Sequence, residues 1–334
     1  MSLTLATLRD FSVFESTPGW HDLGHLHVPF DKLASNERTE GRLAGAIRRR
    51  EPTALIGHSG SGKSSVAAHV LEASADDVAA IVLPVVATAG TTVDSAMHLA
   101  DYLIAVLSRR ARHPDAAVIE SRVATSVETL TSMKGGQLAI GVPWLTGGLA
   151  REVQRQVQTE RTATLVEKTE ALAEVLDLIS SENLHPVLVF DDTDRWLDSG
   201  NAQLVRPFFG ECIRWLLELP TGVVVAVHPT YFDEIPRREL LQYVDTRIDI
   251  PELHHPDNIR AIFDRRLSMF AGFDGDDLDS VLAPDAIAAV YGVYEQAKSL
   301  RRAIQVCHIA VNEALDAGAA LLTPEHIDAA AHAG

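Results

Sequence analysis

The sequence contains little cysteine: the 334 residues include only Cys212 and Cys307. Both stand in apolar segments with a helical character, "FGECIRWLLEL" and "AIQVCHIAV". Two isolated thiols are not the pattern of a disulfide framework, which needs several spaced pairs in a small secreted chain. We interpret both cysteines as small core residues of a protein in a reducing compartment.

Long hydrophobic runs are also missing. No apolar stretch reaches the ~18 residues that a membrane span needs, although hydrophobic residues make up 46% of the chain. The N-terminus has no basic region followed by an apolar segment, which is the pattern of a secretory signal. We see no repeat of fixed period and no low-complexity tract. The sequence therefore predicts a globular, cytoplasmic protein without a membrane segment.

Basic residues are in the minority, with 29 Lys and Arg against 46 Asp and Glu and a net charge of −17. An acidic surface repels phosphate backbones, so non-specific nucleic-acid binding is disfavoured unless a local basic patch overrides the average. Two arginine runs are candidates for such a patch: Arg48 to Arg50, and Arg109, Arg110 and Arg112. We interpret both runs as solvated helix ends.

Apolar runs alternate with helical patterns through the first three quarters of the chain. The strand-like runs are "TALIG", "AAIVLPVVAT", "PVLVF", "TGVVVAVHP" and "TRIDIPEL". Between them, apolar residues recur at spacings of three and four, as in helices. This alternation predicts an α/β fold, a parallel sheet with helices on both faces. Residues 1–35 precede the pattern, and their breakers (Pro18, Gly19, Gly24, Pro29) predict an irregular segment.

Only helical patterns follow residue 251. We therefore expect an α/β domain over residues 1–251 and a small all-helical domain over residues 252–334. An apparent insertion at about 134–182 interrupts the first domain, with glycine pairs around Trp144 and a long polar helix after them. A partner-binding hairpin and a domain-packing element are both compatible with this composition.

The segment "GHSGSGKSS" matches the pattern G-x-x-x-x-G-K-[ST] in full. An apolar strand precedes it and a helix follows, so its backbone N–H groups and the helix N-terminus form an anion site. This motif predicts a Walker A loop, which is typical of nucleotide-binding proteins. Lys63 is expected to reach the β- and γ-phosphates of ATP, and the Ser64 hydroxyl to hold Mg²⁺. The predicted nucleotide-binding residues are Gly57, His58, Ser59, Gly60, Ser61, Gly62, Lys63, Ser64 and Ser65.

The segment "VLVFDDTDRW" is an apolar strand that ends in two adjacent aspartates. Asp191 fits the Walker B position, where a carboxylate holds Mg²⁺, and Asp192 is placed to orient the attacking water. We interpret Asp194 as a turn or helix-cap residue. Asp is one methylene shorter than the Glu of many such sites, and a misplacement on the order of 1 Å can cost ~100-fold in rate. The motif thus predicts slow turnover.

With these motifs in place, the chain resembles the AAA+ ATPases, and among them the origin-recognition initiator type. The segment "SLRRAIQVCHIAVNEALDAGAALLTPEHIDAA" is similar to the lid helices of that clade. The resemblance implies a P-loop NTPase core with a C-terminal helical lid. It also implies that Arg301 is the sensor-two arginine, with Arg302 as the alternative, and that the region of "NERTE" forms the adenine pocket.

The resemblance also implies a sensor-one residue and an arginine finger. The strand "GVVVAV" would be the sensor-one strand, but His228 follows it where the family usually has Asn, Ser or Thr. His228 either orients a water or phosphate or is a packed strand-end residue. Arg237 and Arg238 lie where a finger for a neighbouring subunit's site is expected. A charged surface helix is the alternative. The clade often carries a winged-helix DNA-binding domain after the lid, and none is visible here.

These observations predict a slow ATPase, with ATP and Mg²⁺, that acts as a nucleotide-dependent switch. The expected catalytic residues are Lys63, Asp192 and Arg301. We expect the switch to act on a protein partner or on the protein's own oligomer. One alternative is an initiator-like or loader protein acting on DNA in replication, transposition or mobile-element defence. Others are a nucleotide-bound scaffold without turnover and a KAP- or STAND-type signalling NTPase, because "DDTDR" is similar to their DD-x-DR motif.

Overall fold

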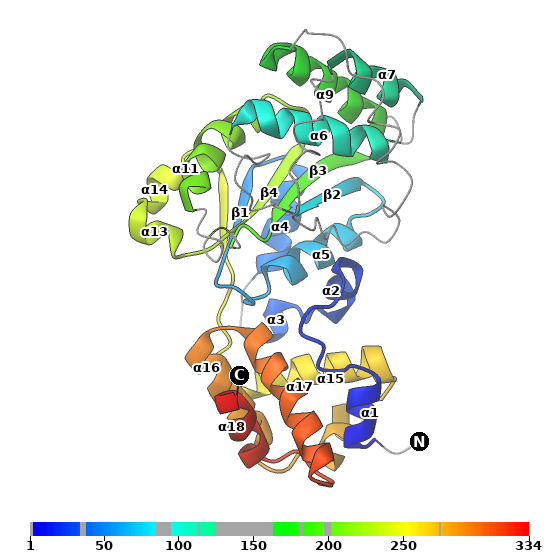
Figure 1. The fold of residues 1–334 in the computed structure, drawn as a ribbon, viewed down its shortest axis with the longest axis vertical. Helices are drawn as coiled ribbons and strands as arrows, with labels where there is room; N and C mark the ends of the chain where they lie inside the picture. Colours follow the sequence, from blue (N-terminus) through cyan, green and yellow to red (C-terminus); the bar gives the residue numbers. More distant parts are fainter. Residues whose placement is uncertain are drawn as a thin grey trace, which may run out of the picture.

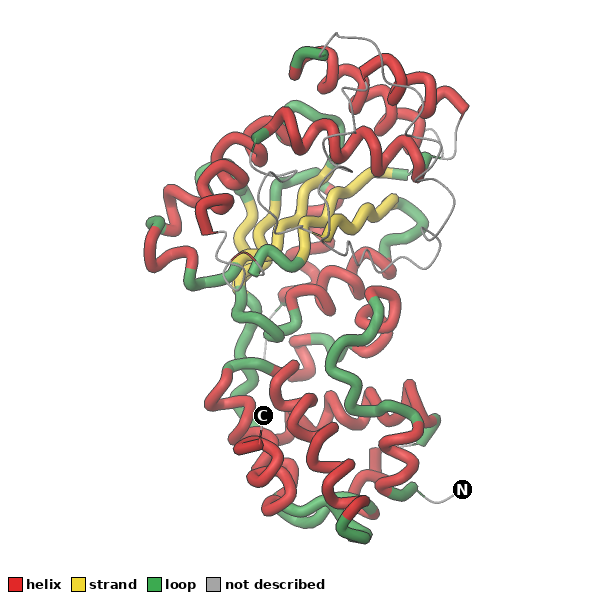
Figure 2. The backbone as a smooth tube through the Cα atoms, in the orientation of Figure 1, coloured by secondary structure: helices red, strands yellow, loops and turns green. Residues whose placement is uncertain are grey.

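The computed structural model describes residues 3–33, 38–84, 95–111, 114–123, 163–180, 184–194, 196, 202–273 and 275–333. Most of the predicted insertion, including Trp144, lies outside these residues, as does Arg112. Within them the chain forms an upper part built on a sheet and a lower part built of helices alone (Figures 1 and 2). No helix among the described residues has the length and apolar character needed to cross a membrane.

The sheet has five parallel strands in the order β2-β3-β4-β1-β5. They are β1 (Thr53–Ile56), β2 (Val78–Pro84), β3 (His185–Asp191), β4 (Gly222–Val227) and β5 (Thr246–Asp249). The five predicted strands are therefore confirmed, together with their parallel direction. Strand β4, and strand β1 after Thr53, are continuous apolar runs because both of their faces are buried.

Helices cover both faces of the sheet. Helices α4 (Thr39–Arg48) and α5 (Lys63–Ala73) lie on one face. The other face carries α6 (Ala96–Arg110), α7 (Pro114–Val123), α9 (Leu165–Ser180), η2 (Ala202–Leu204), α11 (Val205–Pro207), η3 (Phe208–Cys212) and α12 (Ile213–Leu216). Two short helices, α13 (Tyr231–Glu234) and α14 (Arg237–Leu240), lead to β5. Successive residues of β3 alternate between two hydrophobic cores: Val187 and Val189 join one, and Leu188 and Phe190 the other.

The lower part contains α15 (Pro256–Ala271), η4 (Gly275–Ser280), α16 (Ala286–Ala297), α17 (Leu300–Asp316) and α18 (Pro324–Ala333). In α17 the buried residues recur at spacings of three and four, from Ala303 to Ala314. The Ser299 side chain caps this helix by accepting a hydrogen bond from the Arg302 N–H. The prediction of an all-helical C-terminal region is therefore confirmed.

Residues 3–33 are not irregular, in contrast to the expectation from the glycines and prolines of this segment. They form α1 (Leu5–Asp10), α2 (Trp20–Leu26) and α3 (Phe30–Leu33). The breakers Pro18, Gly19 and Pro29 fall between these short helices, whereas Gly24 lies inside α2. A breaker-rich composition is thus compatible with helices of one to two turns.

The N-terminal helix α1 packs on the lower, helical part (Figure 1). The ring centroids of Phe14 and Phe263 are 4.7 Å apart. Buried Arg266 of α15 donates hydrogen bonds to the backbone oxygens of Val13 (2.7 Å) and Glu15. From sequence, we expect this segment to belong to the α/β domain of residues 1–251. Its apolar side chains join a hydrophobic core that contains residues of both the helical part and the sheet-based part.

Candidate functional site

The Gly57–Ser65 loop connects β1 to α5 as the motif predicts. Gly62 has φ +105° and caps α5 from a backbone conformation that side-chain-bearing residues rarely adopt. The Lys63 ammonium is buried and donates to the backbone oxygens of Gly57 (2.8 Å) and His58 (2.9 Å). The Ser61 hydroxyl is buried with no hydrogen-bond partner among the described residues. The loop thus presents a lysine, an unused hydroxyl and a helix N-terminus to one pocket, a donor set suited to phosphate.

The aspartate turn after β3 meets the loop, although more than 120 residues separate them in sequence. Ser64 Oγ donates to Asp191 Oδ1 over 3.0 Å. Asp192 has φ +57° and lines the same pocket as the loop. Buried Thr193 anchors the turn to β4, because its Oγ1 donates to the Ala226 oxygen over 2.6 Å.

Asp194 belongs to the site more directly than its sequence context suggested. It lies in a turn, as expected. Its carboxylate, however, is only 14% exposed, and its Oδ2 lies 4.0 Å from Lys63 Nζ. The spacing of Asp194 from Asp191 in sequence carries no signal for this contact, which depends on the shape of the turn.

Burial and the neighbouring charges have opposite effects on the pKa of Lys63. Burial lowers this pKa, and nearby Arg301 lowers it further, while Asp194 and Asp191 raise it. Burial raises the pKa of Asp191, and the adjacent Asp192 carboxylate raises it further. A cation beside these two neighbouring, partly buried carboxylates would offset their negative charge.

The residues present fit a magnesium ion. Mg²⁺ prefers oxygen ligands and is usually held in nucleotide sites by one or two side chains together with substrate phosphates. The Ser64 hydroxyl and the Asp191 carboxylate are within hydrogen-bond distance of each other beside the loop. The raised pKa of Asp191 shows that this carboxylate is costly to ionise without a positive partner.

The helical part closes the pocket from the opposite side. The backbone N–H groups of Leu300 and Arg301, at the start of α17, both point at the Gly60 oxygen, at 3.0 and 3.4 Å. A side chain at Gly60 would clash, because its Cβ would lie 2.4 Å from Ser299 Oγ and 2.7 Å from Arg301 Cβ. The glycine therefore lets the lid helix rest directly on the phosphate loop.

The side chains of Arg301 and Arg302 lie in different surroundings. Arg301 is exposed but lines the pocket together with the loop and Asp192. Arg302 turns away and donates to the Ala331 oxygen of α18 over 3.2 Å. Between the two arginines named from the resemblance, the structure brings Arg301 to the phosphate loop.

An apolar wall completes the pocket, and sequence reasoning missed nearly all of it. It combines side chains of the N-terminal segment and of the helical part: Leu26, Val28, Phe30, Leu253, Ile262 and Ile304. His27 also lines the pocket, and its buried ring contacts Ser65 Oγ (3.2 Å) and Glu40 (2.7 Å). Burial would raise the pKa of Glu40, but hydrogen bonds from His27 and the Phe30 N–H outweigh it and lower the pKa. The "NERTE" segment, which contains Glu40, was the only sequence signal for this region.

The remaining candidates lie outside the pocket lining. The His228 ring lies 5.3 Å from that of His58 in the loop, and its Nδ1 accepts the Thr230 N–H at 3.2 Å. Arg237 pairs with Asp249 at 2.7 Å and lies over the Phe232 ring. Arg238 is exposed on α14.

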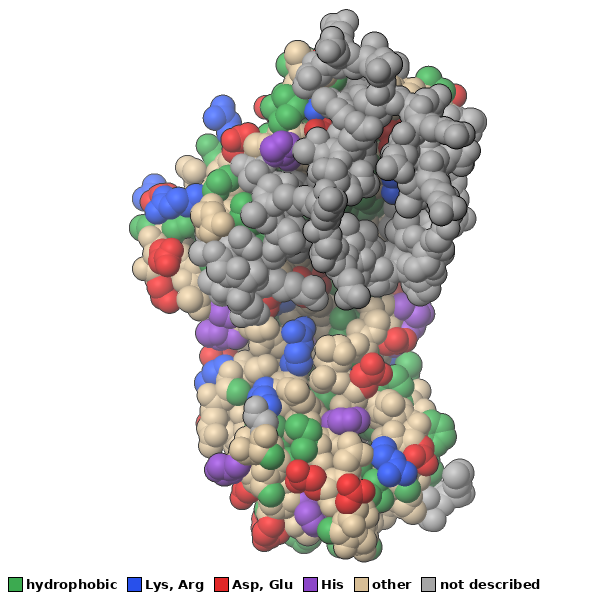
Figure 3. Space-filling view, viewed as in Figure 1, with side chains coloured by type: hydrophobic (Ala, Val, Ile, Leu, Met, Phe, Trp, Pro, Cys, Tyr) green, Lys and Arg blue, Asp and Glu red, His purple; other side chains and the backbone are tan. Residues whose placement is uncertain are grey.

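The surface offers no extended basic area on the face shown in Figure 3. Among its described residues, basic side chains occur singly or in small groups with acidic ones between them. In the arginine run at residue 48, Arg49 pairs with Glu51 at 2.6 Å. This arrangement agrees with solvated helix ends.

Comparison with known proteins gives one family match and several matches of fold. The family described as AAA ATPase domain matches residues 40–225. The CDC6P protein of Pyrobaculum aerophilum is similar in fold, with a TM-score of 0.50 and 14% identity over 96% of this chain and 69% of that one. The ORC1 protein of Aeropyrum pernix, solved in complex with DNA, has a TM-score of 0.49 and 17% identity over 91% of this chain. The present chain spans 65% of that protein's length. No curated protein matches it.

Proposed function

The chain belongs to the AAA ATPase domain family, and on that basis we propose that it binds ATP with Mg²⁺ between its α/β and helical parts and hydrolyses it slowly as a switch. The predicted resemblance to this family is confirmed by the match. The observation that carries the switch is the contact of the lid helix with the phosphate loop at Gly60. A ligand that changes the conformation of the phosphate loop would therefore also change the contact between Gly60 and the start of α17.

Each polar side chain of the pocket has a separate task in this proposal. Lys63 exchanges the Gly57 and His58 oxygens for phosphate oxygens and offsets their charge. Ser64 and Asp191 hold Mg²⁺, which supplies positive charge at the phosphates when bound. Asp192 orients the attacking water, and Arg301 contacts the γ-phosphate. Asp194 lies 4.0 Å from Lys63 and opposes the lowering of the Lys63 pKa that burial causes.

The domain division follows from the same contacts. We propose an α/β nucleotide domain from about residue 16 to 251 and a helical domain of residues 252–334 that also includes the first 15 residues. Hydrolysis removes the γ-phosphate contact of Arg301, so the helical domain is free to rotate. His228, next to His58, is the remaining sensor candidate.

The test measures the switch at its contact point. The exchange rates of the Leu300 and Arg301 amides report whether they still face the Gly60 oxygen. We expect slower exchange with a non-hydrolysable ATP analogue than with ADP. The Ala303 amide, which donates to Ser299 within the helix region, serves as the internal reference. Equal rates in both complexes would contradict the switch. If wild-type protein hydrolyses ATP no faster than Lys63→Ala or Asp192→Ala, it is instead a scaffold without turnover.

The output proposed for the switch is a protein partner or the protein's own oligomer. Arg237 and Arg238 are both exposed, but Arg237 pairs with Asp249 within the chain. Arg238 is therefore the better candidate for a finger that enters a neighbouring site. We expect the mass in solution to increase with the ATP analogue, and Arg238→Ala to reduce the ATPase rate without affecting ATP binding. A mass that does not depend on nucleotide would rule out the oligomer.

An action on DNA is the second candidate function, and the acidic net charge of the chain makes it the less favoured one. The net charge is −17, and electrostatic contacts supply essentially all non-specific DNA affinity. The test is DNA binding with and without ATP over a series of salt concentrations. Absence of ATP-dependent binding even at low salt would eliminate this candidate.

A further inference from the structure

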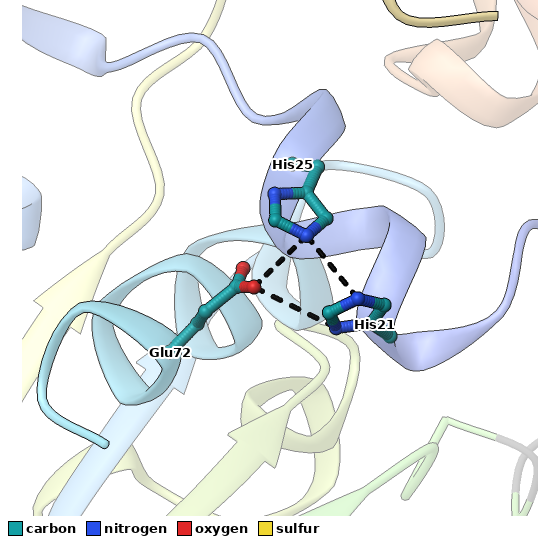
Figure 4. A group of neighbouring side chains, drawn as sticks. All are labelled: His21, His25 and Glu72. Atoms are coloured by element: carbon teal, nitrogen blue, oxygen red, sulfur yellow. Dashed lines mark hydrogen bonds and ion pairs between the residues drawn. The ribbon is translucent and has the colours of Figure 1, made fainter. Parts of the chain in front are cut away.

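A second cluster of chemistry-bearing side chains lies away from the nucleotide pocket, where α2 packs on α5. His21 and His25 stand four residues apart on α2, and Glu72 lies near the end of α5 (Figure 4). A spacing of four places both imidazoles on the same face of the helix. The three side chains point toward one another.

One ligand atom from each of the three side chains lies within 4.8 Å of the other two. His25 Nε2 lies 3.0 Å from Glu72 Oε1 and 3.2 Å from His21 Nε2. The other nitrogen of His21, Nδ1, lies 3.6 Å from the same Glu72 oxygen, and only one of the two His21 nitrogens would bind the metal. Tetrahedral ligands at the usual zinc distances of about 2.0–2.2 Å lie roughly 3.3–3.6 Å from one another. Rotation of the side chains, above all of the His21 ring, would direct one atom of each toward a common centre.

The surroundings leave room for this adjustment and for a fourth ligand. The side chains of His21, His25 and Glu72 are 78%, 41% and 36% exposed, so their rotation costs little and water has access. Gly24, between the two histidines on α2, allows the approach: a Cβ there would lie 2.6 Å from Glu72 Oε2. Two imidazoles, a carboxylate and a water are a known ligand set of zinc.

We propose that His21, His25 and Glu72 bind a divalent transition-metal ion, zinc in the first instance, that fastens α2 to the P-loop helix α5. Two further contacts link the same pair of helices, since Ser65 Oγ donates to the Leu23 oxygen and His69 contacts the Gly24 oxygen. A metal ion ties α2 to the far end of α5, about 14 Å along the helix from Lys63. The site does not depend on the proposed nucleotide function.

The test is titration of tag-free, chelator-treated full-length protein with Zn²⁺ in a calorimeter, without nucleotide. We expect one tight Zn²⁺ site per chain, with Mg²⁺ and Ca²⁺ not competing because they prefer oxygen ligands. His25→Ala and Glu72→Gln should each weaken Zn²⁺ binding at least tenfold. His308→Ala is the matched control, because His308 is also an exposed histidine on a helix. It should leave the affinity unchanged.

Thermal unfolding separates metal binding from simple hydrogen bonding within the cluster. Zn²⁺ should raise the unfolding temperature of the wild type and of His308→Ala, but not of His25→Ala or Glu72→Gln. Unfolding in excess chelator shows that each variant is folded before metal is added. If the wild type and the cluster variants bind Zn²⁺ equally, or if none binds, the three side chains form only a hydrogen-bonded cluster and the proposal is wrong.

Discussion

The two sides of the nucleotide pocket differ in almost every respect. The phosphate side consists of two continuous segments, Gly57–Ser65 and Asp191–Asp194, whose polar atoms bond to one another. The opposite side collects single apolar residues from the N-terminal segment and from α15 and α17. The polar side is suited to binding and hydrolysing the charged phosphates, and the apolar side to binding the flat base of a nucleotide. The following predictions test this division of labour.

Lys63→Ala should have the largest effect. It removes charge-assisted hydrogen bonds to phosphate worth about 1.5 kcal/mol each, so ATP binding should weaken ~100-fold or more. Fluorescence titration with an ATP derivative measures the loss. Lys32→Ala, at an exposed lysine of α3, is the control and should bind as the wild type does. Equal affinities of Lys63→Ala and wild type would show that the nucleotide binds elsewhere.

Arg301→Ala should distinguish ATP from ADP. One charge-assisted hydrogen bond is worth ~1.5–3 kcal/mol, so affinity for ATP should fall roughly 10- to 100-fold while ADP binds almost as before. Arg302→Ala is the control on the next residue, since its side chain contacts Ala331 instead. Parallel titrations with both nucleotides decide the matter. A similar loss for ATP and ADP would place Arg301 away from the γ-phosphate.

Val28→Ala should weaken ATP and ADP equally, because the apolar side contacts what the two nucleotides share. Burial of each methylene is worth ~0.8 kcal/mol, and Val28 is half-buried, so the loss should be about fourfold. Val166→Ala, at an exposed valine of α9, should have no effect. A loss confined to ATP would contradict the assignment of this side to the base and sugar.

Asp192→Glu should have the smallest effect on rate, holding or raising single-turnover hydrolysis by a few fold through its longer reach. The same change should cost about 1 kcal/mol of folding free energy, because Asp and Asn tolerate φ +57° better than Glu. Asp192→Asn keeps the backbone preference but loses the charge, so it should be stable and slow. A large fall in the rate of Asp192→Glu would mean that the site is built for the Asp geometry.

The two sides of the pocket differ in how well the sequence predicts them, because one consists of local motifs and the other of residues that are distant in sequence. The phosphate loop and Asp191 are local motifs in which neighbouring residues carry the whole signal, so their positions follow from sequence. The Lys63–Asp194 contact does not, because the turn at Asp192 sets it. Val28, Ile262 and Ile304 resemble any core residue in sequence, and only tertiary packing brings them together. Arg301 was accessible through the family resemblance, but its choice over Arg302 needed the direction of each side chain.

The position of helix α1 has a mechanical consequence. Both chain ends lie in the helical part (Figure 1), so the α/β part is spliced between two covalent connections, one before α2 and one after β5. A body held by one connection can swing in any direction, whereas a body held by two turns most easily about the line that joins them. The helical domain proposed above should therefore rotate most easily about the line through these two connections. A proline in either connection, placed outside the pocket-lining Ser16, Pro18 and Leu253, should slow this rotation.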